Sequence, residues 1–190
     1  KEVQSGKVVA CEFVKLAITR HISDLERTDI YFDEEAANHF LKFSAHCKYT
    51  KGQLAKEKRK IELTPQQVFR YWVLFGWKRS NGNRRFRRVY FEVARKNGKS
   101  EEAAIVSLYM TILDKEEGAE VYCAATSMAQ ARMVHDAAMV MARKLKNDIP
   151  QIDALVNLTG GGRTGGNISV LDTNSKCEPL PANDDKLDGL

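Results

Sequence analysis

The 190-residue sequence lacks the features that mark membrane, secreted and zinc-binding proteins. No apolar run approaches the ~20 residues that cross a bilayer, so no membrane partner is expected. The four cysteines, Cys11, Cys47, Cys123 and Cys177, form no CxxC pair and have no zinc-ligand spacing. Because no secretory leader is recognisable, we expect four free thiols in a reducing cytoplasm.

A strong charge of one sign is also missing. The chain has 30 basic and 25 acidic residues, a formal net charge of +5, which permits a polyanionic partner without requiring one. The hydrophobic fraction of 43% supports a buried core and excludes a disordered tail. The sequence starts at Lys1 rather than methionine and ends in KLDGL, so we expect a piece of a longer protein.

Helical spacing of apolar residues dominates the first third of the sequence. Helices are predicted over 8–26, where Val9, Phe13 and Leu16 have helical spacing, and over 34–47, capped by Asp33. The polar stretch KGQLAKEKRK, 51–60, is expected to be an exposed linker or turn. We therefore predict a helical segment over 1–60 beside a larger domain over 61–190.

That larger domain is predicted to alternate strands and helices. Thr64-Pro65 opens a helix that ends near Gly76, and Asn81-Gly82 indicates a hairpin turn. The remaining expected elements are strands RRVYFEVA (87–94), AEVYCAAT (119–126) and ISVLD (168–172), with helices over 100–113 and 127–146. This order favours an α/β fold with a parallel sheet and right-handed crossovers.

The triplet Gly98-Lys99-Ser100 lies where the first of these strands is expected to hand over to a helix. In a phosphate-binding loop of this kind, main-chain amides at the helix start face an anion. Gly98 would allow close backbone approach, Lys99 would reach the phosphates, and Ser100 would hold Mg²⁺. The usual pattern has a glycine where this chain has Val93. The alternative is a surface turn with a solvated lysine and a serine cap.

Other polar groups have simpler interpretations. Glu101 and Glu102 are expected to complement the helix dipole rather than act as a catalytic base. The arginine-rich run 84–88 is either a patch for DNA phosphates or, as we prefer, the solvated face of a hairpin. GGGRTGGN, 160–167, lacks the Lys-Ser pair and is expected to be a flexible loop. His39 and His46 have too few neighbouring ligands for a metal site.

Several segments together resemble one known family. ARKNGKS, 94–100, looks like the deviant Walker A motif of the large terminase subunit of tailed bacteriophages, which has an arginine where this chain has Arg95. The stretch 63–79 resembles the adenine-recognition segment of the family, with Gln67 in the place of its glutamine but no aromatic residue before it. Further similar segments are RHISDLER, YFDEEAA, VYCAATSMAQA and PLPANDDKLDGL.

The resemblance implies a RecA-like P-loop NTPase of the ASCE class, incomplete, with an N-terminal helical segment. It also implies an ATP- and Mg²⁺-dependent motor that moves double-stranded DNA into a procapsid in the host cytoplasm. Its partners would be the portal protein, the small terminase subunit and further copies of itself in a ring, and the whole protein would carry a nuclease domain.

The resemblance also implies a role for each loop residue. Arg95 and Lys99 would be catalytic and stabilise charge on the γ-phosphate. Lys96 and Asn97 would contribute main-chain amides, and Gln67 would hydrogen-bond the adenine edge.

The Walker B acids of the family would follow Leu190, so we expect residues 1–190 to bind ATP weakly and hydrolyse it poorly. Two other functions stay open from the residues alone. These are another P-loop enzyme, such as a helicase or nucleotide kinase, and a non-enzymatic DNA-binding module.

Overall fold

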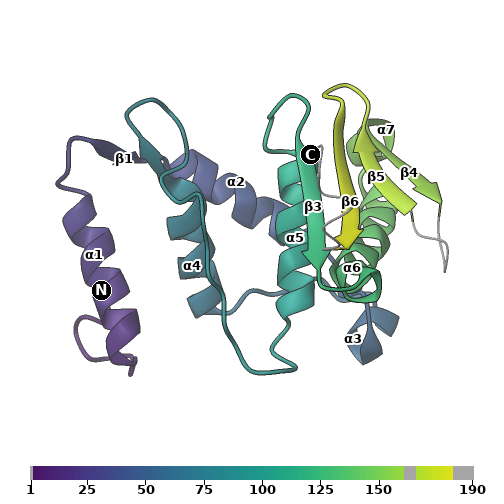
Figure 1. Cartoon of the computed structure of the whole chain (residues 1–190). Helices are drawn as coiled ribbons and strands as arrows, with labels where there is room; N and C mark the ends of the chain where they lie inside the picture. The colour runs from purple at the N-terminus through teal and green to yellow at the C-terminus, as the bar shows by residue number, and fades with distance from the viewer. Residues whose placement is uncertain (1, 161–165, 182–190) are drawn as a thin grey trace. The chain divides into compact units, whose positions relative to one another are not determined.

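The computed structural model describes residues 2–160 and 166–181 (Figure 1). The described residues form two compact units. The first contains residues up to 42 together with Leu63–Phe91, and the second contains Phe43–Glu62 and the residues from Glu92 onward. The predicted domain boundary at residue 60 stays a prediction.

The first unit is built mainly from helices. It holds α1 (Glu12–Asp24), most of α2 (Glu34–Ser44) and α4 (Pro65–Gly76), with the short antiparallel strands β1 (Ile30–Phe32) and β2 (Trp77–Arg79). All three predicted helices are present. The expected cap of α2 is confirmed, since Asp33 Oδ1 accepts a hydrogen bond from the Ala36 amide at 2.9 Å.

Helix α4 begins where the sequence predicts, because Thr64 and Gln67 satisfy each other's main-chain amides. Thr64 Oγ1 accepts from the Gln67 amide, and Gln67 Oε1 accepts from the Thr64 amide at 2.7 Å. This reciprocal arrangement is a capping box, and Pro65 occupies the first helical position, where its missing N–H costs nothing.

An aromatic cluster forms the core of the first unit. Trp77 is 1% exposed and packs with Ile30 and Val73, and Phe32, Phe69, Trp72 and Phe86 surround them. The Trp77 indole N–H donates to His21 Nδ1 at 3.1 Å, which joins α1 to this core. Burial holds the pKa of His21 below its ordinary value, although the charge of Asp24 opposes the shift. His21 is therefore a packed, neutral acceptor.

Gly76 closes α4 against this core, and its substitution tests the packing. A Cβ at this position would lie 2.5 Å from two atoms of the Phe32 ring, which is itself in edge contact with Trp77. Alanine improves helix propensity, but the overlap outweighs that gain. We expect Gly76→Ala to lower the free energy of unfolding by about 1–2 kcal/mol in urea denaturation.

Two further variants isolate this clash. The exposed Gln66→Ala is expected to change the free energy of unfolding by less than about 0.5 kcal/mol. The double variant Phe32→Leu, Gly76→Ala should lose less free energy of unfolding than the sum of the losses in the two single variants. Additive losses would show that the Phe32 contact is not the cause.

The apolar side chains whose spacing predicts α1 are largely exposed. Val9 is 98% exposed, Phe13 83% and Leu16 54%, although their spacing is that of a helix packed on a core. The helix is instead fixed at its C-terminal end, by His21 and by the carboxylate of Asp24. Helical periodicity indicates that a helix has an apolar face, but it does not show what covers that face.

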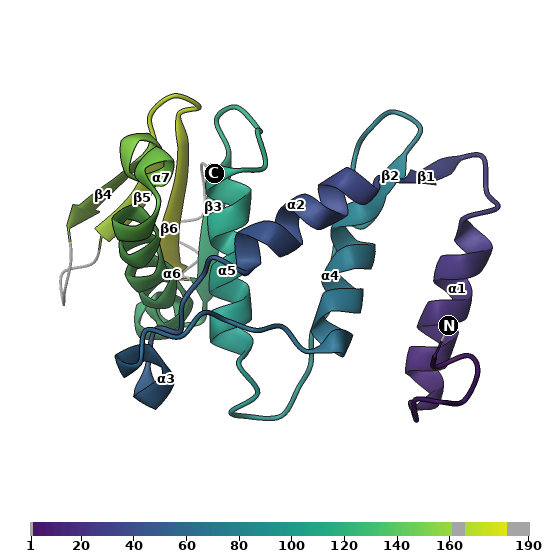
Figure 2. The ribbon, with the colours of Figure 1, turned by 180° about the vertical axis from the view of Figure 1, so that it is seen from behind.

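The second unit contains a four-stranded sheet with helices on one face (Figures 1 and 2). The strand order is β3 (Glu120–Ala125), β6 (Ser175–Pro181), β5 (Gly166–Val170) and β4 (Val156–Gly160). Helices α5 (Lys99–Ile112), α6 (Met128–Asp148) and α7 (Pro150–Leu155) cover the sheet. The predicted helices over 100–113 and 127–146, the 119–126 strand and the expected ISVLD strand are confirmed in α5, α6, β3 and β5.

The sheet is mixed, so the prediction of a parallel sheet is wrong. Among the described strands only β3 and β6 run parallel, while β4, β5 and β6 form an antiparallel meander. Strands β4 and β6, helix α7 and the short α3 (Gly52–Lys56) were not predicted from sequence. Of the expected flexible loop GGGRTGGN, 160–167, residues 161–165 lie outside the described residues, whereas Gly160 ends β4 and Gly166 and Asn167 begin β5.

The strand expected at 87–94 is not formed. These residues pair with no other strand among those described, and Val89 and Tyr90 are 56% and 88% exposed. β-branched and aromatic side chains favour a strand, but a strand needs a neighbour to accept its hydrogen bonds. The turn at Asn81-Gly82 is present, closed by the Gly82 amide donating to the Arg79 carbonyl at 2.8 Å.

All four cysteines are free thiols, as expected, and Cys123 and Cys177 lie in contact. In the parallel pairing of β3 with β6, Cys177 faces Val121 and Cys123 faces Pro179, an offset of two residues. Such an offset places Cα atoms about 7–8 Å apart, beyond the reach of a disulfide. The two thiols are therefore buried neighbours in the core rather than a disulfide.

Candidate functional site

The candidate site is the loop over residues 94–98 and the start of α5 at Lys99. Residues 94–99 are all exposed, and Ser100 is half-buried. None of the main-chain amides from Arg95 to Ser100 donates a hydrogen bond to another described residue, and the first bonded amide is that of Glu102, to the Gly98 carbonyl at 3.0 Å. The loop therefore presents a run of unpaired N–H groups at the positive end of a helix dipole.

Two residues of this loop have left-handed backbone. Gly98, the N-cap of α5, has φ 74° and ψ 8°, and Lys96 has φ 67°. A Cβ on Gly98 would meet nothing within 4 Å, so glycine is needed here for its backbone angle rather than for space. A lysine in this region is uncommon, and strained conformations of this kind concentrate at binding sites.

The side chain of Lys99 folds back over the loop. Its Nζ donates to the Val93 carbonyl at 2.5 Å, six residues earlier in the chain. The ammonium is thereby tied to the main chain at the start of the loop. An anion bound by those amides would replace the carbonyl with a stronger, charged acceptor.

The hydroxyl of Ser100 has no hydrogen-bond partner among the described residues. It differs from two hydroxyls further along the same helix, since Ser107 donates to the Ala103 carbonyl at 2.9 Å and Thr111 to the Ser107 carbonyl at 2.8 Å. Ser100 therefore keeps its oxygen available as a ligand for a hard cation such as Mg²⁺.

Asn97 and Arg95 have different local roles. Asn97 Nδ2 donates to the Ala94 carbonyl at 3.1 Å and to the Arg95 carbonyl at 3.4 Å, which holds the loop in its turn. The Arg95 guanidinium is exposed and has no partner among the residues that the structure describes. Sequence reasoning had assigned Asn97 only a main-chain role, so its side-chain contribution is an addition.

Gln67 lies in the first unit, whereas the loop lies in the second. Its carbonyl oxygen is already used in the cap of α4. Recognition of adenine by Gln67 stays a prediction, and it would have to operate together with this capping role.

The first turn of α5 contains a contact that sequence reasoning missed. Glu101 Oε1 accepts hydrogen bonds from Thr50 Oγ1 at 2.6 Å and from the Thr50 amide at 3.0 Å. Thr50 is 51 residues away in the chain, so no local pattern could have found it. Glu102 is 4% exposed. The expectation that neither acid is a catalytic base stays a prediction, but Glu101 does more than complement the helix dipole.

The arginine-rich run 84–88 is only partly a solvated face. Arg85 Nη1 lies 2.5 Å from Asp24 Oδ2, and its guanidinium stacks on Phe86 and Trp77. Arg87 and Arg88 are exposed. The stretch KEKRK, 56–60, is exposed, as expected.

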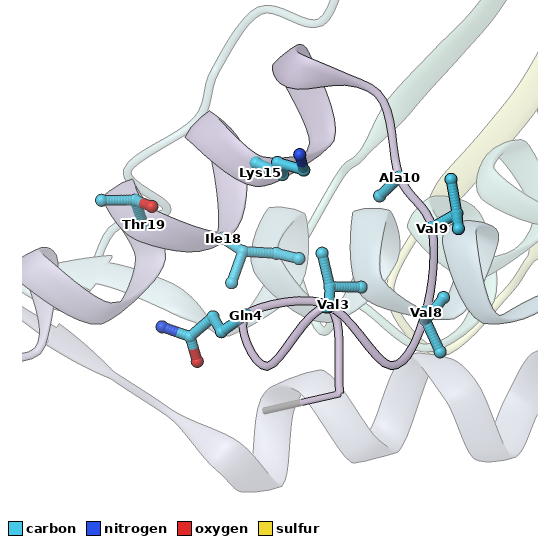
Figure 3. Close-up of a pocket in the computed structure, with 9 residues that line it drawn as sticks. Val3, Gln4, Val8, Val9, Ala10, Lys15, Ile18 and Thr19 are labelled. Carbon is cyan, nitrogen blue, oxygen red and sulfur yellow. The ribbon is translucent and has the colours of Figure 1, made fainter.

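Two hollows in the surface do not coincide with the predicted site. The one in Figure 3, about 520 Å³, lies between the N-terminal residues and α1, where Val3, Val8 and Ile18 give it a mostly apolar lining beside Lys15. The other, about 450 Å³, is lined by polar groups of α6 and the sheet, including Arg132, Asn167 and Glu178. Neither contains a residue of the loop.

Two further properties bear on cofactors and membranes. No cluster of three or more His, Cys, Asp or Glu side chains suited to a metal occurs in residues 2–160 and 166–181. Within the same ranges, no helix combines the length and apolar character that crossing a bilayer requires.

Comparison with known proteins places the chain in a family. The model of a family described as "Terminase large subunit, ATPase domain" matches residues 65–190. Among solved structures, the chain is similar to the large terminase of bacteriophage HK97, at 20% sequence identity and a TM-score of 0.57. That match covers 80% of this chain and 28% of the HK97 chain, so the sequence spans less than a third of that protein. No curated protein matches the sequence.

The structural match shows that the chain has the mixed α/β, RecA-like fold of an ATPase domain, as predicted. The family match spans well over half of the sequence and begins with helix α4, where the resemblance to the adenine segment also begins. The chain therefore belongs to the family of terminase large subunit ATPase domains.

Proposed function

We propose that residues 94–100 bind the phosphates of ATP, and that this chain is the ATP-binding portion of a motor that packages double-stranded DNA into a viral procapsid. The observation that carries the proposal is the loop geometry. Left-handed turns at Lys96 and Gly98 lead into α5, with unpaired amides on the loop and the Lys99 ammonium folded over it. Amides at a helix start, joined by a lysine, form a site for a polyphosphate.

The residues present also fit a divalent cation. The Ser100 hydroxyl has no competing partner among the described residues, and it follows the lysine directly, as a ligand to Mg²⁺ on the phosphates would require. Bound Mg²⁺ would neutralise charge on the phosphate oxygens. Lys99 and Arg95 would stabilise the remaining charge, Arg95 within its own subunit or across a subunit boundary.

The activity of the whole protein follows from the family. A terminase large subunit ATPase domain would drive DNA movement by ATP hydrolysis, with the portal protein and small terminase subunit as partners, a homo-oligomeric ring as the working assembly and a nuclease in the full chain. Its place would be the host cytoplasm. The family match favours this function over a helicase or nucleotide kinase. The engagement of Arg85 with Asp24 weakens the case for a DNA-binding module based on the arginine-rich run.

Gln67 offers a test that separates nucleotide recognition from folding. Glutamate at this position can still cap α4, because a carboxylate oxygen accepts from the Thr64 amide as the amide oxygen does. It lacks the N–H donors that an adenine edge needs. We expect Gln67→Glu to leave the thermal midpoint almost unchanged while reducing the preference for ATP over GTP about tenfold in Mg²⁺-containing titrations.

Gln67→Ala serves as the comparison, because it should lose both the cap and the selectivity. If Gln67→Glu binds ATP and GTP with the preference of the unmodified chain, Gln67 is a capping residue alone. If the unmodified chain binds no ATP at millimolar concentration, the proposed site is wrong.

A further inference from the structure

The phosphate-binding helix carries negative charge close to where a triphosphate would bind. Glu101 and Glu102 occupy the first turn of α5, directly after Lys99 and Ser100. A carboxylate complements the helix dipole in the nucleotide-free protein, but near a bound triphosphate it would repel like charge. The position of the Glu101 side chain therefore matters for nucleotide binding.

The structure turns this carboxylate away from solvent and fixes it. Both donors of Thr50, its hydroxyl and its amide, bind the same oxygen of Glu101. The second oxygen is buried and has no partner among the described residues. Burial, and then the charge of Glu101, raise the pKa of Cys47 to about 12, so the carboxylate faces the segment that contains Cys47 and Thr50.

That segment is itself anchored within the second unit. Lys144 Nζ of α6 donates to the Tyr49 carbonyl at 2.6 Å, and Lys48 Nζ lies 2.5 Å from Asp148 Oδ2 at the end of α6. The Tyr49 amide also donates to the Arg59 carbonyl at 3.1 Å. Thr50 is thus a fixed point against which the first turn of α5 is held.

We propose that Thr50 is a positioning residue for phosphate binding: it holds the Glu101 carboxylate away from the phosphate loop and keeps the first turn of α5 in place. This inference rests on the proposed function of residues 94–100. Without the Thr50 hydroxyl, the carboxylate loses its shorter bond and gains freedom to approach the site, so Lys99 and Ser100 are less well oriented and a bound triphosphate meets more negative charge.

The test compares valine and serine at position 50, because valine removes only the hydroxyl from a similar shape and serine retains it. We expect Thr50→Val to weaken Mg-ATP binding about fivefold, and Thr50→Ser to stay within about twofold of the unmodified chain. The valine–serine difference should vanish in a Glu101→Ala background, because the hydroxyl then has no carboxylate to hold. Thermal midpoints without nucleotide show that each variant is folded.

Hydrogen exchange at the Glu102 amide gives a second measurement that needs no ATP. This amide makes the first hydrogen bond of α5, to the Gly98 carbonyl, and should exchange faster in Thr50→Val than in Thr50→Ser. Equal ATP affinities of the two variants, or a difference that persists without Glu101, would overturn the positioning role. The proposed function would still stand if Lys99→Ala abolished binding in the same assay. If the unmodified chain binds no ATP, the proposed function fails first.

Discussion

Lys99→Ala is expected to weaken binding of Mg-ATP by about a hundredfold or more. The side chain supplies the one ammonium that is folded over the loop, and each charged hydrogen bond to phosphate contributes about 1.5–3 kcal/mol. The unpaired amides remain in the variant, so weak residual binding to inorganic phosphate should survive. Isothermal titration with ATP, with and without Mg²⁺, measures both effects.

The matched control is Lys56→Ala, which removes an exposed ammonium at the end of α3. This change alters net charge by the same amount, so it corrects for long-range attraction of the polyanion. We expect it to change ATP affinity less than twofold. Should Lys99→Ala bind ATP as tightly as the unmodified chain, residues 94–100 are a surface turn and not a phosphate site.

Of the substitutions named for this chain, Arg85→Ala should lower the free energy of unfolding the most. Asp24 is 5% exposed. The Arg85 guanidinium binds both oxygens of its carboxylate, with Nη1 2.5 Å from Oδ2 and Nη2 3.4 Å from Oδ1. Removing the guanidinium leaves a buried negative charge with only the longer contact to Arg27, at 3.5 Å. Breaking a buried pair in this way costs about 3 kcal/mol, measurable by urea denaturation.

The dependence of this loss on pH identifies its cause. Burial raises the pKa of Asp24, but the hydrogen bond and charge of Arg85, with the charges of Arg27 and Arg20, outweigh burial and hold the pKa below 3.8. The pair therefore stabilises the fold above pH 3.8 and loses its effect as the pH falls through the lowered pKa. The difference in the free energy of unfolding between Arg85→Ala and the unmodified chain should become smaller as the pH falls through the lowered pKa of Asp24. Arg87→Ala, an exposed neighbour, should show no such loss, and a gap that is constant with pH would point to lost stacking on Trp77.

Local features of the fold could be predicted from the sequence because they depend on neighbouring residues. Asp33 and Thr64 begin their helices where their side chains can reach amides three residues ahead. The triplet Gly98-Lys99-Ser100 predicted the start of a helix, and α5 begins at Lys99 with Gly98 as its N-cap. These interactions are complete within a few residues, so one sequence suffices to find them.

Features that depend on distant partners could not be predicted. The antiparallel pairing of β4, β5 and β6 was not predicted, and the β-forming residues 87–94 did not reveal that no described strand would pair with them. The spacing of the apolar residues along α1 predicted a helix, but it did not show what would cover that face. The contact of Thr50 with Glu101 joins residues 51 positions apart, and no pattern in the sequence between them indicates that they lie together.

Residues 87–94 lie outside the described strands, and this affects how the chain behaves in solution. They contain one of the three points at which the chain passes between the two compact units, from Phe91 to Glu92. Main-chain groups that pair with no strand are open to water. Arg87 and Arg88 are exposed, and trypsin cuts after arginine. Brief digestion should therefore cut the chain after Arg87 or Arg88, so that α4 and the phosphate loop lie on different fragments.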